Sequence, residues 1–190
     1  MVEGGLKADL LENRLAVTAA GCFIDKKNVP TQATVLITEQ IGKQRAQGFE
    51  FSAVGKLAEP WSIIAKYSYI DSRIVNDPDP TLSHVRFHNI PYNAFNVWTR
   101  YNLMQRPEQT FGLAAGVIFV GNRAGDLHDS FQLPGYTRYD AGVYYQRRNL
   151  SATVYFENIF DKEYYVSSVD NLTVFPGNPF TVRATVGVTF

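Results

Sequence analysis

Residues 182–190 read Val182-Arg183-Ala184-Thr185-Val186-Gly187-Val188-Thr189-Phe190, an alternation of apolar with polar or small residues that stops on a terminal aromatic. Successive side chains of a β-strand point to opposite faces of the sheet, so this stretch predicts a strand with one apolar and one polar face. In water such a bare, flat apolar strand invites aggregation. In a transmembrane β-barrel, lipid covers the apolar face and a neighbouring strand pairs with the edge. The end of the chain therefore favours a membrane barrel over a soluble protein.

The composition agrees with this interpretation and excludes one class of partner. The chain has 190 residues, enough for one ordinary domain, and a formal net charge of +0. Proteins that bind nucleic acid usually carry a basic patch, so we expect no nucleic-acid partner. Aromatic residues make up 14% of the chain and charged residues only 19%, below the usual quarter or so. Barrel strands hide an apolar face by alternation, so a modest average hydropathy does not argue against a membrane protein.

No segment of the sequence predicts a membrane-spanning helix or a targeting peptide. The longest nearly apolar run, Gly112–Gly121, is far shorter than the roughly 20 residues that a spanning helix needs. The first ten residues, MVEGGLKADL, lack a basic region followed by an apolar core, so we expect no signal peptide. Cys22 is the only cysteine, which excludes an intrachain disulfide and suggests a small packed residue.

Alternation with a period of two recurs along the whole chain and predicts about nine strands. The expected strands are Gly5–Leu11, Arg14–Ile24, Arg45–Lys56, Trp61–Asp71, Tyr92–Asn102, Phe111–Val120, Tyr136–Tyr145, Leu150–Glu157 and Val182–Phe190. Many aromatic side chains, such as Trp61, Tyr69 and Tyr101, fall on the apolar faces, as expected for the aromatic bands of an outer-membrane barrel.

The connections between these strands alternate strictly between short and long. The long ones are Asp25–Gln44, Ser72–Pro91, Gly121–Gly135 and Asp161–Phe180. A meander that crosses a membrane shows this pattern, with short turns on the periplasmic side and long loops outside. The fold class that we predict is all-β, an antiparallel up-and-down meander of about nine strands that is part of a larger transmembrane β-barrel.

Several motifs resemble the TonB-dependent siderophore receptors. The stretch Gln44-Arg45-Ala46-Gln47-Gly48-Phe49-Glu50-Phe51 is similar to a recurring strand of that family. The most specific match is Glu157-Asn158-Ile159-Phe160-Asp161-Lys162-Glu163-Tyr164-Tyr165, which resembles the family's Asn-apolar-Phe-Asp-Lys-x-Tyr-Tyr box. Gly177-Asn178-Pro179 resembles the segment that leads into the last strand, although Phe180 stands where the family usually has Arg.

The resemblance implies that residues 1–190 are the C-terminal part of a receptor barrel of about 22 strands, with the plug domain and the signal peptide absent. Bacterial single-chain barrels have an even number of strands, so nine strands alone should leave two unpaired edges. The implied function is uptake of ferric siderophores across the Gram-negative outer membrane, energised by the TonB complex through the missing plug segment. We therefore expect that the chain cannot transport alone.

Candidate site residues follow from the loops and from the lumen face. Loop residues that could contact an organic siderophore are His128, Phe131, Tyr164, Tyr165 and Phe175. Polar residues expected to line the lumen, facing a plug or water, are Lys66, Arg100, Arg138, Asp140 and Arg183. The terminal residues Val186, Val188 and Phe190 resemble the signal read by the barrel-assembly machinery, which together with outer-membrane lipid is an implied partner.

No pattern indicates catalysis, a cofactor or a resident metal. His84 and His88 lie in a proline-bounded stretch without the Glu of a zinc-protease motif, so they are expected to be solvated loop residues. We expect no enzymatic activity. Two other classes remain open. A small complete outer-membrane barrel, with an adhesin or structural role, would have an even strand number and would pair its first and last strands. A soluble β-sandwich would need no detergent.

Overall fold

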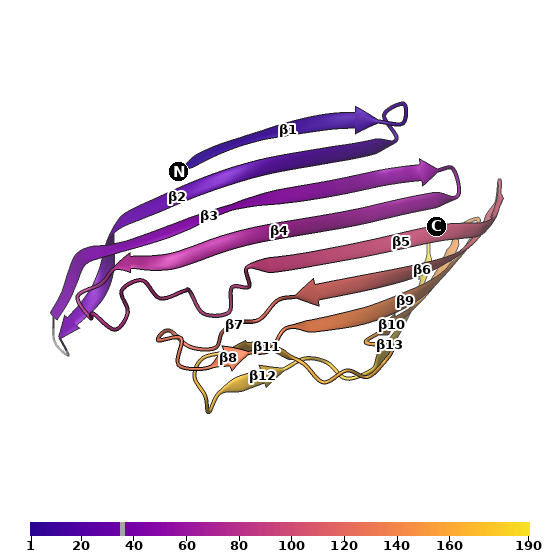
Figure 1. Cartoon of the computed structure of the whole chain (residues 1–190). Helices are drawn as coiled ribbons and strands as arrows, with labels where there is room; N and C mark the ends of the chain where they lie inside the picture. The colour runs from indigo at the N-terminus through magenta and orange to yellow at the C-terminus, as the bar shows by residue number, and fades with distance from the viewer. Residues whose placement is uncertain (35–36) are drawn as a thin grey trace.

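A computed structural model describes residues 1–34 and 37–190, and Figure 1 shows their arrangement as one long antiparallel meander. The nine strands of the main sheet are β1 (Val2–Leu10), β2 (Leu15–Thr34), β3 (Ile37–Ala58), β4 (Trp61–Asn76), β5 (Asn93–Arg106), β6 (Gln109–Val120), β9 (Tyr136–Arg147), β10 (Leu150–Glu157) and β13 (Thr181–Val188). Each pairs with the next strand in this order, which confirms the predicted fold class. None of the described residues forms a helix long and apolar enough to span a membrane.

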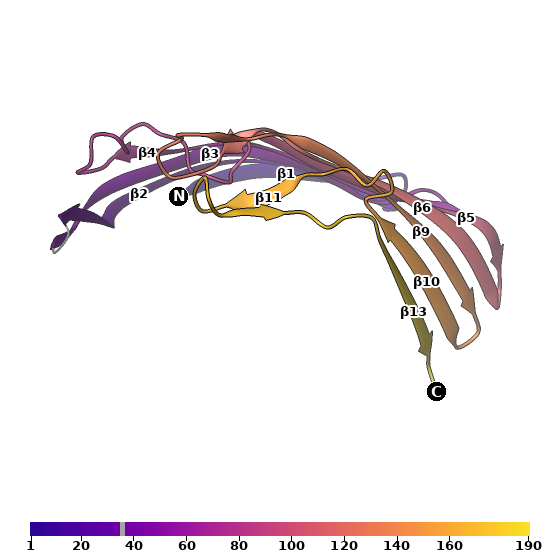
Figure 2. The same cartoon turned by 90° about the horizontal axis from the view of Figure 1, so that it is seen from below.

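The sheet is a single curved layer whose two edge strands do not pair with each other. Its edges are β1 and β13, at opposite ends of the strand order. Figure 2 shows the curvature, with the connection that holds β11 (Tyr165–Ser168) and β12 (Val174–Pro176) on the concave side. The other two sheets of the described residues, β11 with β12 and β7 (Arg123–Ala124) with β8 (Gln132–Leu133), have two strands each, so neither forms the second layer of a soluble sandwich. The unpaired edges disagree with a small closed barrel.

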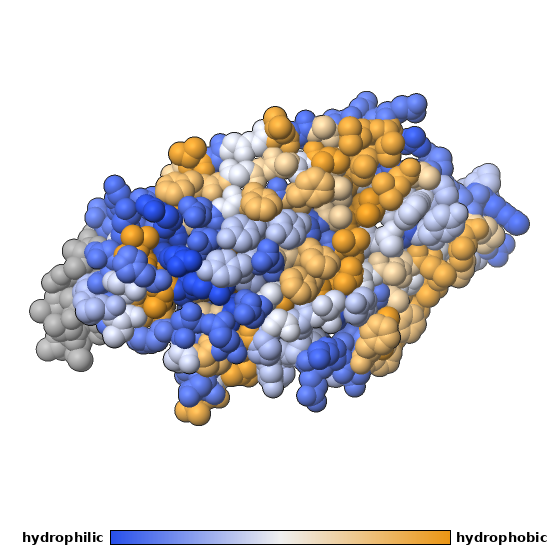
Figure 3. Space-filling view, viewed as in Figure 1, coloured by the Kyte–Doolittle hydropathy of each residue, from blue (hydrophilic) through white to orange (hydrophobic). Residues whose placement is uncertain are grey.

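The register places the apolar residues of neighbouring strands beside one another on the convex face. One such row crosses six strands in the order Leu6, Ala19, Phe51, Tyr67, Phe95 and Phe119. Several apolar side chains of this face lack protein cover: Leu6 is 81% exposed, Phe51 is 43% exposed and Val186, on β13, is 69% exposed. Figure 3 shows the resulting apolar surface in orange. Because a register shift of one residue would turn every apolar side chain to the other face, the alternation in the sequence fixes the pairing.

The tight turns and the long connections lie at opposite ends of the sheet, as the sequence predicts. The tight turns include Leu11–Arg14 and Glu59–Pro60. The long connections at the other end comprise residues 77–92, 121–135 and 158–180. The expectation for Asp25–Gln44 was wrong, because most of this stretch is not a loop but the continuation of β2 and β3 as a paired hairpin. Its alternation is obscured by register shifts after Lys26, and residues 35–36 lie outside the described residues.

The two faces of β5 should respond oppositely to a buried charge. Val97 lies on the convex face and its neighbour Asn96 on the concave face. An arginine on the lipid side of a barrel near the bilayer centre costs about 2–4 kcal/mol, whereas lumen positions tolerate charge. We expect Val97→Arg to lower the free energy of unfolding from a bilayer by about that amount.

The matched control is Asn96→Arg, which introduces the same side chain one residue earlier in the strand. Denaturant titrations of the protein in lipid vesicles, followed by the gel shift between its folded and unfolded forms, measure both changes. Equal destabilisation by the two variants would contradict the assignment of faces.

Candidate functional site

The three long connections form one cluster, hereafter the outer loop cluster, made of residues 77–92, 121–135 and 158–180. The second connection contains the short pair β7 (Arg123–Ala124) and β8 (Gln132–Leu133), and the third contains β11 and β12. Hydrogen bonds that cross between the connections hold the cluster together. Buried backbone N–H and C=O groups in irregular segments need hydrogen-bond partners. In this cluster a few polar side chains supply those partners.

Arg123 ties the second connection to the third. Its side chain is almost fully buried, with 1% of the residue exposed. Nη2 donates hydrogen bonds to the backbone oxygens of Tyr165 at 2.6 Å and Val166 at 3.0 Å. Burial lowers the pKa of the Arg123 guanidinium, and the nearby Tyr136 acts in the opposite direction. Arginine nevertheless stays charged in proteins, so these hydrogen bonds to β11 are charge-assisted.

Asn89 and Ser168 tie the first connection to the other two. The Asn89 side chain donates to the Ser168 oxygen at 2.8 Å and accepts from the Ser168 N–H at 2.9 Å. The Asn89 N–H donates to the Ala124 oxygen at 2.8 Å, and the Ser168 hydroxyl donates to the Gly125 oxygen. Asn89 adopts a φ of 62°, a conformation that asparagine tolerates better than most residues. Residues from all three connections thus share one hydrogen-bonded joint.

A group of charged residues, buried except for Arg183, anchors the third connection to the concave wall of the sheet. Arg138 on β9 donates to the Glu157 carboxylate at 2.6 Å, to the Asp140 carboxylate at 2.9 Å and to the Tyr164 hydroxyl at 2.9 Å. Arg183 on β13 donates to the second oxygen of Glu157. Asp140 and Glu157 are 3% and 5% exposed, so both buried carboxylates are paired. The sequence predicted a lumen position for Arg138, Asp140 and Arg183, and the structure adds that they belong to one network.

The hydrogen bonds of Asn158 explain why the Asn-Ile-Phe-Asp-Lys stretch begins with an asparagine. Its backbone N–H donates to Asp140 at 2.8 Å, and its side-chain amide donates to the Lys162 and Asn178 oxygens, each at 3.0 Å. Its side-chain oxygen accepts from the Lys162 N–H at 2.9 Å. Asn158 is 1% exposed and has a φ of 55°. A single side chain therefore closes the turn that starts the third connection and holds its return segment.

The predicted ligand-facing residues divide into three groups: His128 and Phe131 on the second connection, the buried Tyr164, and the exposed pair Tyr165 and Phe175. His128 is exposed on the second connection, and the Phe131 ring packs over Gly125, where an added Cβ would approach within 2.3 Å of the ring. Tyr164 is 5% exposed, because its ring packs on Gly177 and Tyr136 and its hydroxyl accepts from Arg138.

Tyr165 and Phe175 form the third group, 42% and 46% exposed on the paired strands β11 and β12. The structure therefore places Tyr165 and Phe175 on neighbouring strands as accessible aromatics and buries Tyr164 in the packing of the loop. Contact of any of the five with a ligand stays a prediction. The joint residues Arg123 and Asn89 were not anticipated from the sequence, since a single Arg or Asn in a loop carries no periodic signal.

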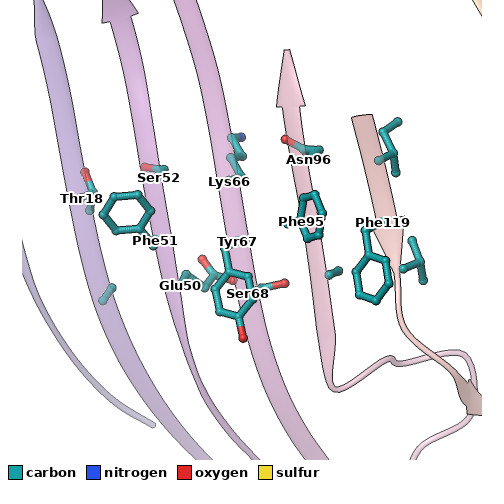
Figure 4. Close-up of a pocket in the computed structure, with 14 residues that line it drawn as sticks. Thr18, Glu50, Phe51, Ser52, Lys66, Tyr67, Ser68, Phe95, Asn96 and Phe119 are labelled. Atoms are coloured by element: carbon teal, nitrogen blue, oxygen red, sulfur yellow. The ribbon is translucent and has the colours of Figure 1, made fainter. Parts of the chain in front are cut away.

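Two further predicted features lie on the sheet itself. Val186 and Val188 on β13 and the terminal Phe190 are exposed at the edge of the sheet, and their role as an assembly signal stays a prediction. On the concave face a hollow of about 480 Å³ follows the middle of β2 to β6 (Figure 4). Its polar lining consists of Thr18, Glu50, Ser52, Lys66, Ser68 and Asn96. The predicted lumen residue Lys66 thus lines a water-accessible trough.

Comparison with known proteins decides the family. Residues 2–159 match the family model described as "TonB dependent receptor-like, beta-barrel". The chain belongs to the TonB-dependent receptor family. Members of this family are outer-membrane β-barrel proteins of Gram-negative bacteria and are receptors rather than enzymes, so the chain is placed in that membrane.

Individual relatives cover nearly all of the chain. The metal-pseudopaline receptor CntO of Pseudomonas aeruginosa is 35% identical over 181 residues, which are 93% of this chain and 25% of CntO. The crystal structure of the siderophore receptor PiuA from Acinetobacter baumannii superimposes with a TM-score of 0.85 at 26% identity, over 97% of this chain and 28% of PiuA. The closed form of the ferric-catecholate import receptor Fiu from Escherichia coli gives a TM-score of 0.81 at 27% identity, over 99% and 27%. The chain spans about a quarter of the length of the curated relatives it matches.

Removing the Arg123 guanidinium should loosen the outer loop cluster without unfolding the barrel. The variant Arg123→Met keeps a similar volume but leaves the oxygens of Tyr165 and Val166 without their donor. The expected loss is about 3 kcal/mol of local stability, from two charge-assisted hydrogen bonds. Hydrogen–deuterium exchange of residues 158–180 should speed up at least tenfold.

Arg148→Met is the matched control, because Arg148 is an exposed arginine at the opposite end of the sheet that pairs only with Glu108 among the contacts described. Unchanged exchange of residues 158–180 in Arg123→Met would contradict the joint.

Proposed function

We propose that this chain is the C-terminal barrel segment of an outer-membrane receptor that captures a metal–siderophore complex and is energised by TonB. The observation that carries the proposal is the match over 93% of the chain to CntO, a metal-pseudopaline receptor. Resemblance to PiuA and Fiu, described as siderophore and ferric-catecholate receptors, points to the same class of ligand. In the complete receptor, further strands would pair with the free edges of β1 and β13 and close the barrel.

The arrangement of the outer loop cluster supports a role in ligand capture. Binding sites that tolerate little rearrangement need loops held rigidly by a scaffold. The joint at Asn89 and Arg123 couples the three connections, and the network at Arg138 fixes the third one to the wall. Tyr165 and Phe175 then present aromatic surface from a fixed hairpin, suited to stacking on a catecholate or another planar chelating group.

The concave wall supports the transport half of the proposal. The trough at Lys66 and Glu50 is open and carries charged and hydroxyl-bearing side chains, as expected of a lumen wall that faces water or a plug domain. We assign the coupling to TonB to the plug segment, by resemblance to the family, and not to residues of this chain. The barrel segment therefore supplies the outer loops and part of the lumen wall.

Uptake assays test this function directly. The complete gene that carries this chain is expressed in a strain that lacks its own siderophore receptors. Radiolabelled ferric catecholate and metal–pseudopaline are then supplied separately. We expect uptake of at least one chelate that is lost when tonB is deleted. Correct insertion of the protein with no uptake of any metal chelate would contradict the proposal.

Removing both accessible aromatics of the hairpin should weaken capture. We expect the double variant Tyr165→Ala and Phe175→Ala to raise the Kd for the transported chelate roughly thirtyfold, since aromatic anchors that a ligand covers commonly contribute about 1 kcal/mol or more each. Phe160→Ala is the matched control, because Phe160 is 71% exposed on the same connection but packs against Tyr139 on the convex side. Titration of the purified receptor with chelate, followed by fluorescence quenching, gives the Kd. An equal effect of the control would argue against a ligand-facing role for the hairpin.

A further inference from the structure

The convex face carries a group of cations just beyond its aromatic residues. Cross-strand pairing places Arg45 beside Asp25 on one side and beside Arg73 on the other. The backbone of Arg73 also forms an isolated antiparallel β-bridge with Arg86, which brings Arg86 next to it. Lys43 lies next to this row on the same face. These residues, Lys43, Arg45, Arg73 and Arg86, are hereafter the basic band. Figure 3 shows the hydrophilic surface over this end of β2 to β4, bordering the orange apolar face.

The basic band has more positive than negative charge. Among the described residues, two carboxylates contact it: Asp25, which pairs with Lys43 Nζ at 3.3 Å and Arg45 Nε at 3.2 Å, and Asp71, which pairs with Arg73 Nε at 2.9 Å. Four cations against two anions leave a surplus of two positive charges. The side chains remain accessible, with Arg73 47% and Arg45 39% exposed. The surplus charge is therefore available to an external anion.

Aromatic rings hold the guanidinium groups in place. The Arg86 guanidinium carbon lies 3.7 Å above the centre of the Tyr92 ring, and Arg73 donates to the Tyr92 hydroxyl at 3.0 Å. Tyr92 in turn stacks on Tyr69, with ring centres 6.0 Å apart. On the neighbouring strands the Arg45 guanidinium lies 5.0 Å from the centre of the Phe23 ring. Guanidinium groups positioned in this way lose little freedom when they bind an anion.

The depth of the basic band in the membrane identifies its partner. On β4, Arg73 follows Tyr69 by four residues, about 13 Å along a strand. With strands tilted by 35–45°, this distance corresponds to roughly 10 Å along the membrane normal. Tyr69 stacks on Phe49, and Phe23 lies on the same face of β2, so we take these rings as part of the aromatic band that barrels carry at the membrane boundary. The basic band therefore reaches the headgroup layer of the outer leaflet, where anionic groups are phosphates of lipids.

From this placement we propose that the basic band binds the phosphate groups of a phosphorylated glycolipid in the outer leaflet. Arginine forks match phosphate oxygens, and the surplus of two charges suits a lipid with two phosphate groups. The acyl chains of this lipid would cover the apolar row that includes Phe49 and Phe51, both exposed on the convex face. The site is independent of the metal–siderophore ligand, because it lies on the lipid side of the wall and not on the side of the lumen.

Native mass spectrometry of the complete receptor tests the proposal with bisphosphorylated lipid A and its enzymatically dephosphorylated form as probes. The unaltered protein should retain the phosphorylated lipid preferentially. The double variant Arg73→Gln and Arg86→Gln should weaken this binding roughly thirtyfold, as expected for two basic residues at a membrane surface. Arg147→Gln is the matched control, because Arg147 lies on the same face at the opposite end of the sheet and should leave lipid binding unchanged.

A second variant separates lipid binding from a merely structural ion pair. Asp71→Asn removes one of the two carboxylates and raises the surplus charge. We expect it to strengthen binding of the phosphorylated lipid several-fold. Weaker binding in Asp71→Asn, unchanged binding in the double variant, or equal binding of the dephosphorylated lipid would each overturn the proposal. Chelate uptake is measured in parallel, so failure of the lipid site and failure of the receptor function give different results.

Discussion

The hydrogen bonding of the backbone in lipid is the constraint on which the rest of this structure depends. Hydrocarbon offers no partner to an N–H or C=O group, so every strand in the bilayer must pair along its length. In β3 and β6 both edges are paired almost residue by residue with their neighbours. Once the pairing is fixed, the side chains alternate between the two faces. The exposure of Leu6 and Val186 is then a consequence of the environment rather than a defect of packing.

Beyond the membrane the same need is met by side chains instead of strands. Arg123 supplies donors to two oxygens of β11, and Asn158 satisfies two backbone groups of the turn that follows β10 and one of the return segment at Asn178. The network at Arg138 connects this loop to the wall. Buried, paired polar residues give a loop a defined position, at the cost that removing one partner leaves the other unsatisfied. Hydrogen bonds and ion pairs therefore connect the outer loops to the barrel wall.

The alternation of the sequence was enough to predict the strands that lie in the bilayer. Leu150–Glu157 has the bounds that the structure gives β10, and Trp61 begins β4 as predicted. Outside the bilayer the pattern is less informative, because both faces meet water and no apolar period is required. This is why the continuation of β2 and β3 through Asp25–Gln44 was expected to be a loop. The joint at Asn89 and Arg123 depends on contacts between residues distant in the chain, which no local pattern reports. Burial of Tyr164 follows from the same contacts, whereas its neighbour Tyr165 stays exposed.

Accessibility scanning along β5 tests whether the convex face of the sheet meets lipid and the concave face meets water. Single cysteines are introduced from Phe95 to Tyr101 in the complete receptor after replacement of Cys22, spin-labelled, and exposed in lipid vesicles to oxygen and to a water-soluble nickel chelate. Oxygen access should alternate with a period of two and should be highest at Phe95, Val97, Thr99 and Tyr101. The intervening residues on the concave face should respond less to oxygen and more to the nickel chelate. Accessibility that does not alternate, or oxygen access at Asn96, Trp98 and Arg100 instead, would contradict the barrel register described for this chain.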